Sequence, residues 1–305
     1  MARKRKGLRI DGVLLLDKGV GASSNFALQK ARRLLNAQKA GHTGTLDPLA
    51  SGLLPLCFGE ATKFSADLLD AEKEYIADIA FGRSTTTGDM EGETLEEKPA
   101  DFTVEDLEAA LKGFIGETEQ IPPMYSALKK DGVALYKLAR SGETVERKPR
   151  KVVISRLDLL NADLPRAVVR VACSKGTYVR VLAEDIGRAL GTVAHLTALR
   201  RIRVGDVKLE GAVTIEALEN ADEAGRLAML KPADSLISTL PVVRLDEVQT
   251  EKFRHGQRIT VSGCDACGRV RVYGPVCGEV QLLGCAQLAD QGLLTPERLV
   301  TFEPN

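Results

Sequence analysis

Residues 41–55 read Gly41-His42-Thr43-Gly44-Thr45-Leu46-Asp47-Pro48-Leu49-Ala50-Ser51-Gly52-Leu53-Leu54-Pro55. This stretch surrounds one carboxylate, Asp47, with small residues, and its glycines let the backbone approach a bulky ligand because glycine has no Cβ. An Asp-Pro pair is also a common helix start, with Asp as the N-cap and Pro at the first helical position. The glycine spacing matches neither the Walker phosphate loop nor the G-x-G-x-x-G dinucleotide loop. Two interpretations remain at this point, a helix start and an active-site loop around Asp47.

Outside this stretch, the apolar pattern alternates between strand-like and helix-like periods. It predicts strands over residues 12–16, 74–81, 152–160 and 167–173, and helices over residues 24–35, 103–111 and 179–190. Thr103 and Asp106 fit a capping box at the second helix, and Gly191 closes the third. This mixed order predicts an α+β domain with a mainly antiparallel sheet flanked by helices.

The pattern changes after about residue 235, where short strands over 257–261, 269–273 and 279–283 alternate with glycine and proline turns. We therefore expect a large domain over residues 1–235 and a small β-rich domain over residues 236–305. A basic segment, residues 124–151, interrupts the large domain and contains a short helix near residues 135–138.

The charged residues are distributed unevenly, although the net charge of the chain is zero. Residues 1–63 carry a net charge of +7 and residues 124–210 a net charge of +9, whereas residues 64–123 carry −12. Such asymmetry allows a basic face that could neutralise nucleic-acid phosphates, or scattered solvated charges. The apolar run after the basic start is too short for a signal peptide, and no run is long enough to span a membrane. A cytoplasmic protein is expected.

Four of the six cysteines lie near the end of the chain, at positions 264, 267, 277 and 285. A zinc ribbon would pair two C-x-x-C knuckles, and here the second pair is spaced too widely. Cys277 and Cys285 fit equally well as small core residues of strands. Structural zinc and a metal-free module both stay open.

Six blocks of sequence resemble the signature of the TruB family of tRNA pseudouridine synthases. They extend from residue 13 to about residue 205, with one departure: the family usually has Lys-Pro-x-Gly where this chain reads Lys18-Gly19-Val20-Gly21. The blocks are residues 13–18, 41–63, 72–75, 121–129, 173–180 and 195–201. The resemblance implies the pseudouridine synthase fold, an RNA-pinching thumb over 124–151 and a C-terminal PUA-like RNA-binding domain.

The resemblance also implies a catalytic set of Asp47, Tyr75 and Arg180. Arg180 begins a predicted helix, where the positive end of the helix dipole disfavours a cation, so it is expected to pair with an anion. That anion could be any surface carboxylate, or Asp47, which the cation would keep ionised for nucleophilic attack. In the family the matching arginine pairs with the nucleophilic aspartate. Tyr75 would stack on the target uracil, although a core tyrosine is the ordinary alternative.

Four further residues match family positions that bind the substrate. Tyr178 and Leu199 match contacts to the flipped nucleotide, and His42 matches a residue that helps to hold it out of the RNA loop. Lys63 could contact a phosphate or be an ordinary surface lysine.

The implied reaction converts uridine 55 in the T-arm loop of tRNA to pseudouridine, after the base has been flipped out of its stack. It requires no metal, redox partner or nucleotide cofactor, and the expected protein is a monomer without an obligatory protein partner or membrane contact. Asp47 could attack C1′ or C6, or assist glycal formation. The alternatives are an RNA-guided relative, which would carry longer extensions, and a non-catalytic chaperone that refolds tRNA.

Overall fold

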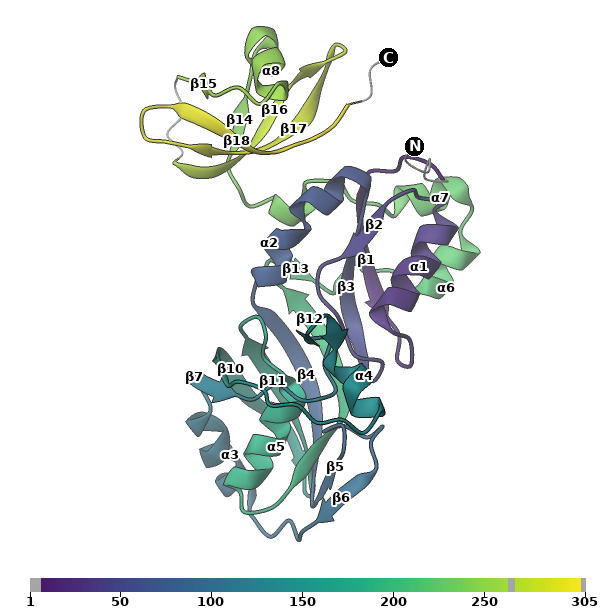
Figure 1. Cartoon of the computed structure of the whole chain (residues 1–305), viewed down its shortest axis with the longest axis vertical. Coiled ribbons are helices and arrows are strands. Elements are labelled where there is room, and N and C mark those ends of the chain that lie inside the picture. The colour runs from purple at the N-terminus through teal and green to yellow at the C-terminus, as the bar shows by residue number, and fades with distance from the viewer. Residues whose placement is uncertain (1–6, 263–266, 303–305) are drawn as a thin grey trace.

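The computed structural model describes residues 7–262 and 267–302, which form two sheet-containing parts along the long axis of the molecule (Figure 1). Among these residues, the first sheet has nine strands and the second has five. The basic start before residue 7 and Cys264 lie outside the described residues. The α+β class and the mainly antiparallel sheet are confirmed.

The first sheet has the order β1-β3-β12-β4-β11-β10-β7, with β2 paired to β3 and β13 to β12. Its pairs are antiparallel except β3 with β12, which run parallel through Leu199 opposite Ala50 and Arg201 opposite Gly52. The strands are β1 Gly12–Lys18, β2 Ala40–His42, β3 Ala50–Phe58, β4 Lys73–Phe81, β7 Gly116–Gln120, β10 Arg150–Asp163, β11 Arg166–Cys173, β12 Ala194–Val204 and β13 Val207–Lys208.

Helices cover the two faces of this sheet unequally. Alternate residues of β1, such as Leu14 and Leu16, face a large core that four helices close, while Val13 and Leu15 face a smaller core on the other side. The helices on the large core are α1 Ser24–Leu34, α3 Val104–Gly113, α5 Val179–Ala189 and α6 Ile215–Asn220. The smaller core is closed by η1 Gly59–Phe64, α2 Ser65–Asp70 and η2 Ser235–Ile237.

The predicted helices form close to their expected bounds. Thr103 and Asp106 make the capping box that their spacing predicts, and Gly191, at φ +73°, follows the end of α5. Short elements complete the large part of the molecule: β5 Arg83–Thr85, β6 Thr94–Glu97 and α7 Glu223–Ala228.

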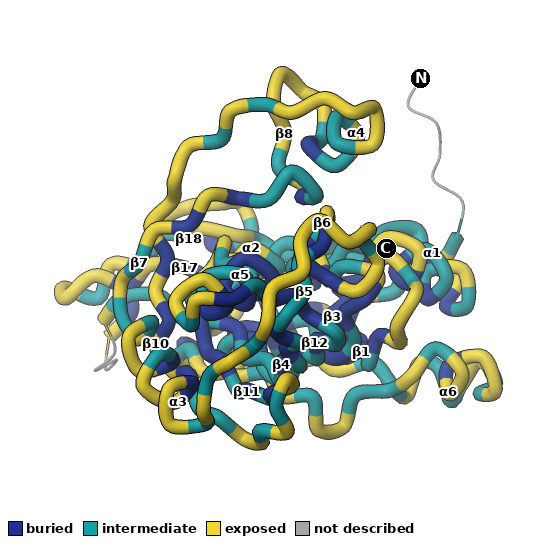
Figure 2. Tube along the Cα trace, turned by 90° about the horizontal axis from the view of Figure 1, so that it is seen from below, coloured by how far each residue is buried: buried dark blue, intermediate teal, exposed yellow. Residues whose placement is uncertain are grey.

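The basic segment 124–151 forms an arm that stands off the body of the protein (Figure 2). It carries β8 Lys129–Lys130, β9 Val133–Ala134 and α4 Leu135–Arg140. Most of its residues are exposed, including the cations Lys129, Lys130, Lys137, Arg140 and Lys148.

The second sheet has the order β14-β16-β17-β18-β15 and its own apolar core with α8 Glu247–Arg254. Its strands are β14 Val242–Arg244, β15 Ile259–Thr260, β16 Gly268–Val276, β17 Glu279–Leu288 and β18 Leu293–Leu299. Cys285 of β17 packs with Phe64 and Ile237 of the first part, and Arg269 of β16 pairs with Asp67. The division at residue 235 stays a prediction, although each sheet has a separate core.

Candidate active site

The residues around Asp47 form a loop, not a helix. Residues 43–49, here called the Asp47 loop, connect β2 to β3, so the helix-start interpretation is wrong. Buried Ser24 of α1 fixes this loop, because its Oγ donates to Leu46 O at 2.9 Å and accepts from Leu46 N at 2.8 Å. Gly44, at φ +128°, supplies a turn that other residues rarely adopt.

Arg180 forms an ion pair with the Asp47 carboxylate. Its Nη2 lies 2.9 Å from Asp47 Oδ2, and its Nε lies 3.7 Å from Oδ2 of a second acid, Asp89. The Arg180 side chain is 6% exposed, whereas that of Asp47 is 42% exposed. Two backbone carbonyls, Thr87 O and Tyr125 O, accept further hydrogen bonds from the guanidinium. The predicted pair therefore exists, with a fixed cation behind an accessible carboxylate.

A cavity of about 250 Å³ lies in front of this pair, and five of the predicted residues line it. They are Asp47, Tyr75, Tyr178, Arg180 and Leu199. Burial raises the pKa of both Tyr75 and Tyr178, which keeps both hydroxyls protonated at neutral pH. The three predicted catalytic residues, Asp47, Tyr75 and Arg180, therefore converge on one cavity.

Two buried cations, Lys73 and Arg201, line the same cavity and were not anticipated. Both cations lie on the same face of the sheet as Tyr75. Lys73 is two residues before Tyr75 on β4, and Arg201 of β12 is the direct partner of Tyr75 in the pairing of these strands. The period of two, counted back from Tyr75, could have placed Lys73 in the site. Arg201 required the pairing of β12, which the sequence did not reveal.

Both cations are bound mainly to backbone oxygens. Lys73 Nζ donates to Leu69 O at 2.6 Å and to Ala71 O at 2.5 Å. Arg201 donates from Nε to Leu53 O at 2.8 Å and from Nη2 to Gly44 O at 3.2 Å. Burial, reinforced by the charge of Arg201, lowers the pKa of Lys73 from 10.5 to about 8. The charged or titratable groups that influence Lys73 are Arg201, Cys173, Asp70 and Lys175.

The other two predicted residues lie elsewhere. His42 ends β2 beside the Asp47 loop and is absent from the cavity lining, and burial together with Arg201 lowers its pKa. Lys63 lies at the junction with the second sheet, where Nζ donates to Glu60 Oε2, Leu299 O and Thr301 Oγ1 at 2.6 to 2.7 Å. Three acceptors satisfy its three N–H groups, so this geometry does not bring Lys63 to the cavity.

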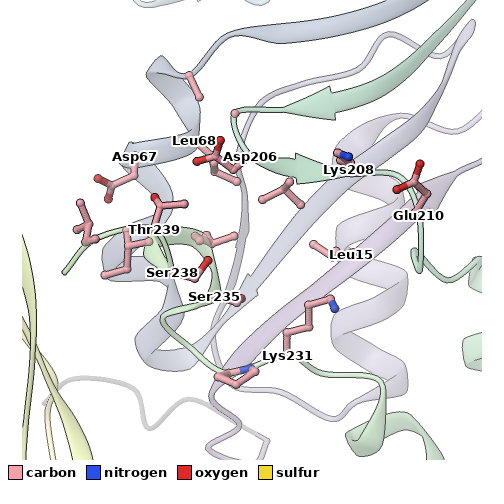
Figure 3. Close-up of a pocket in the computed structure, with 17 residues that line it drawn as sticks. Leu15, Asp67, Leu68, Asp206, Lys208, Glu210, Lys231, Ser235, Ser238 and Thr239 are labelled. Atoms are coloured by element: carbon pink, nitrogen blue, oxygen red, sulfur yellow. The ribbon is translucent and has the colours of Figure 1, made fainter. Parts of the chain in front are cut away.

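A larger cavity, about 610 Å³, lies on the other face of the first sheet, between β13, α2 and residues 231–240 (Figure 3). Leu15 and Leu68 line its apolar side, and charges of both signs, among them Asp206 and Lys208, surround it. None of the predicted catalytic or substrate-binding residues contributes to it.

No cluster of three or more potential metal ligands occurs among the described residues. Cys285 is buried in β17, where Arg269 Nη2 lies 3.3 Å from its Sγ, whereas Cys277 is exposed at a turn with φ +52° and is not a core residue. Because Cys264 lies outside the described residues, the zinc interpretation stays untested. Nor does the described part of the chain contain a helix with the length and apolar character to cross a membrane.

Comparison with known families agrees with this geometry. The model of the TruB family pseudouridylate synthase N-terminal domain matches residues 32–179. Two C-terminal models, of tRNA pseudouridylate synthase B and of pseudouridine synthase II TruB, match residues 180–238 and 241–300. The tRNA pseudouridine synthase B of Burkholderia lata is 59% identical over 296 residues, which cover 95% of this chain and 90% of the relative. The chain belongs to the TruB family. It is accordingly a pseudouridine synthase.

Other TruB relatives and more distant structures extend this result. The tRNA pseudouridine synthase B of Ralstonia pickettii is 55% identical over 301 residues, covering 95% of this chain and 94% of the relative. Among solved structures, one chain of a Cbf5-Nop10-Gar1 complex superposes with a TM-score of 0.69 at 26% identity, covering 94% of this chain and 84% of that one. The TruB fold of this chain is thus shared with a protein that occurs in a complex.

Proposed function

We propose that this chain converts uridine to pseudouridine at position 55 in the T-arm loop of tRNA, with Asp47 as the nucleophile and the target base flipped out of the RNA. The observation that carries this proposal is the accessible Asp47 carboxylate, held by buried Arg180 at the wall of a cavity that Tyr75 also lines. A base stacked in an RNA loop could not enter the cavity that this carboxylate lines, which supports flipping.

The chemistry breaks the bond between ribose C1′ and uracil N1, turns the ring, and joins C5 to C1′, while C5 loses a proton and N1 gains one. Asp47 attacks the substrate, Arg180 fixes the direction of the carboxylate, and Asp89 supports the far side of the guanidinium. Tyr75 and Leu199 offer flat and apolar surfaces to the ring, and Tyr178 lies at the same wall. His42 is proposed to hold the RNA loop open beside the Asp47 loop.

The substrate is proposed to be tRNA because relatives named tRNA pseudouridine synthase B share 55–59% of their residues with nearly the whole chain. The resemblance to a chain of the Cbf5-Nop10-Gar1 complex is weaker, at 26% identity, which disfavours an RNA-guided role. The chain would act in the cytoplasm as a monomer, without a metal, a cofactor or an obligatory protein partner.

Two parts of the protein are proposed to hold the RNA outside the cavity. The arm 124–151 exposes several cations and stands off the body, as a thumb that closes on RNA would (Figure 2). The second sheet, residues 236–305, is proposed as a PUA-like RNA-binding domain. Because phosphate contacts release counterions, we expect tRNA affinity to fall steeply with rising salt, and a flat salt dependence would contradict a basic RNA-binding face.

The deciding experiment measures tritium release from tRNA that carries C5-labelled uridine, with wild type, Asp47→Asn and a matched surface control, Asp101→Asn. We expect release with wild type and with the control, and none with Asp47→Asn. Equal release by Asp47→Asn would contradict its role as nucleophile. Absence of release from wild type, with tRNA refolding retained, would favour the chaperone. A tRNA with cytidine at position 55 tests the site: continued release would contradict specificity for position 55.

A further inference from the structure

Positive charge accumulates at the deep end of the catalytic cavity. Arg201 is 1% exposed and Lys73 is 7% exposed, whereas the Asp47 side chain at the same cavity is 42% exposed. Among the described residues, no carboxylate oxygen lies within 4.0 Å of Lys73 Nζ or of the Arg201 guanidinium. The cavity therefore combines an accessible anion with two buried cations that have no close anionic partner.

Burying these two cations without a close anion lowers the stability of the folded protein, which points to a role in function. A buried charge without a counter-charge loses its hydration and is poorly compensated by backbone carbonyls alone. The two cations also repel each other, since Arg201 is among the causes that lower the pKa of Lys73. The charge of Arg201 extends further, because it also perturbs the pKa of Lys18, His42 and Tyr75. The deep end of the cavity is thus a region of positive potential.

We propose that Arg201 and Lys73 form an anion site that stabilises negative charge on the uracil ring while the ring is detached from the ribose. This inference rests on the proposed function and adds a role that the nucleophile and its arginine do not perform. Tyr75 of β4 pairs with Arg201 of the neighbouring strand β12, and both line the cavity. A ring that stacks on Tyr75 would therefore lie near both cations.

Negative charge develops on the uracil ring by each route open to Asp47. When Asp47 attacks C1′, or when a glycal forms by loss of the ribose C2′ proton, the C1′–N1 bond breaks with its electron pair on N1, and the ring becomes an anion delocalised onto O2 and O4. When Asp47 instead adds to C6, the electron pair of the C5–C6 double bond moves toward C4, O4 becomes an enolate, and C1′–N1 breaks afterwards. The electron pair at C5 then forms the C5–C1′ bond, while the bond from Asp47 to C1′ or C6 breaks or the glycal regains its C2′ proton. C5 releases its proton and N1 takes one up, so the product ring is neutral. Fixed cations in a low-dielectric cavity stabilise this charge without reorganisation.

The test compares wild type and Lys73→Met on two T-arm stem-loops, one with the target uridine and one with 5-fluorouridine. Fluorine withdraws electrons, so the fluorinated ring carries negative charge more readily and depends less on the protein. On uridine the product is pseudouridine, whereas C5 of 5-fluorouridine has no proton to release, so its rearranged ring keeps the fluorine beside the new C5–C1′ bond. Both products are followed in single turnovers by nuclease digestion and chromatography. Loss of one charge-stabilising group lowers such rates by about 100-fold, and we expect this on uridine but a loss below about 10-fold on 5-fluorouridine.

Three further variants complete the test. Lys73→Arg keeps the charge and should retain a rate within about 10-fold of wild type, and Lys112→Met on exposed α3 should have no effect. Arg201→Gln should behave like Lys73→Met, and if it fails to fold, Lys73→Met decides alone.

The possible results separate the two proposals. An equal loss on both substrates, or no loss, would overturn the anion site while leaving the proposed function intact. A weaker tRNA affinity with an unchanged single-turnover rate would make Lys73 a phosphate contact and would also overturn it. Absence of conversion by wild type would remove the proposed function and this inference together.

Discussion

The strand that follows the Asp47 loop, β3, lies close against the backbone of β12 at Gly52, and Gly52→Ala should separate the two strands. A Cβ built at Gly52 would lie 2.2 Å from Arg201 O and 2.9 Å from Arg201 N, where ordinary contacts are 3.4 Å or more. Both of these atoms are backbone, so a strand must move by roughly 1 Å because the interior is close-packed. Gly52 also has φ +97°, which adds conformational strain.

The magnitude follows from these two terms. Placing an L-residue at positive φ costs about 1–2 kcal/mol, and overpacking costs about 1–3 kcal/mol more. We therefore expect the free energy of unfolding to fall by about 3 kcal/mol, measured by urea denaturation. Because the shift would move Arg201 and the start of β3 relative to the Asp47 loop, kcat should also fall by about 100-fold.

Gly191→Ala is the matched control for this experiment. Gly191 has φ +73°, but no atom lies within 4 Å of a Cβ built there, so only the conformational term applies. We expect a loss of about 1 kcal/mol and an unchanged kcat. If Gly52→Ala were no less stable than Gly191→Ala, or retained full activity, the close approach of β3 and β12 would not limit stability or position the site.

Asp89→Asn removes one of the two carboxylates that face Arg180, and we expect kcat to fall about 10-fold with unchanged tRNA affinity, whereas a wild-type kcat would contradict its supporting role. Burial holds the pKa of Lys73 at about 8 against 10.5 when unfolded, so its charge opposes folding fully below pH 8 and this penalty fades as the pH rises toward 10.5. Wild type should therefore gain stability relative to Lys73→Met across that pH window in urea titrations, and a constant difference would refute the burial of a charge. Lys63→Met removes hydrogen bonds to Glu60 and to the chain near Thr301, so we expect a lower urea midpoint and an unchanged kcat. Weaker tRNA binding with full stability would instead make Lys63 a phosphate contact.

Elements with a clear period or a local cap were predictable from the sequence. The helix α3 forms with the Thr103 and Asp106 capping box, and β4 follows its alternating pattern from Lys73 to Phe81. Both signals, the apolar period and the helix cap, depend only on residues close together in the sequence.

The central strands β3 and β12 were missed for physical reasons. In β3, eight of the nine residues are buried, so no polar alternation marks it, and Gly52 and Pro55 are residues that usually argue against a central strand. In β12, irregularities between Leu196 and Ala198 and between Arg201 and Arg203 shift the register, which breaks the period of two. Arg201 therefore reads as a surface cation in the sequence, although the fold buries it.

The three residues predicted to be catalytic all line the cavity, as do two of the four further residues predicted to bind the substrate. Asp47 lies in the loop before β3, Tyr75 near the start of β4 and Arg180 in the first turn of α5, and the large core fixes these three elements. All four of these further residues depended on the resemblance alone, and of them Tyr178 and Leu199 line the cavity whereas His42 and Lys63 do not. Lys63 donates hydrogen bonds to Leu299 and Thr301, which are far from it in the sequence, so no local pattern could have predicted these partners.

The parallel pairing of β3 with β12 also has a consequence for synthesis on the ribosome. Because the two strands are far apart in the sequence, Asp47 emerges long before Arg180, its ionic partner, and before Arg201. At translation rates of about 5–20 residues per second, the interval between Asp47 and Arg180 is roughly 7–27 s. During that time the edge of β3 that pairs with β12 has no partner strand, and a ribosome-bound fragment that stops before residue 180 contains Asp47 without Arg180.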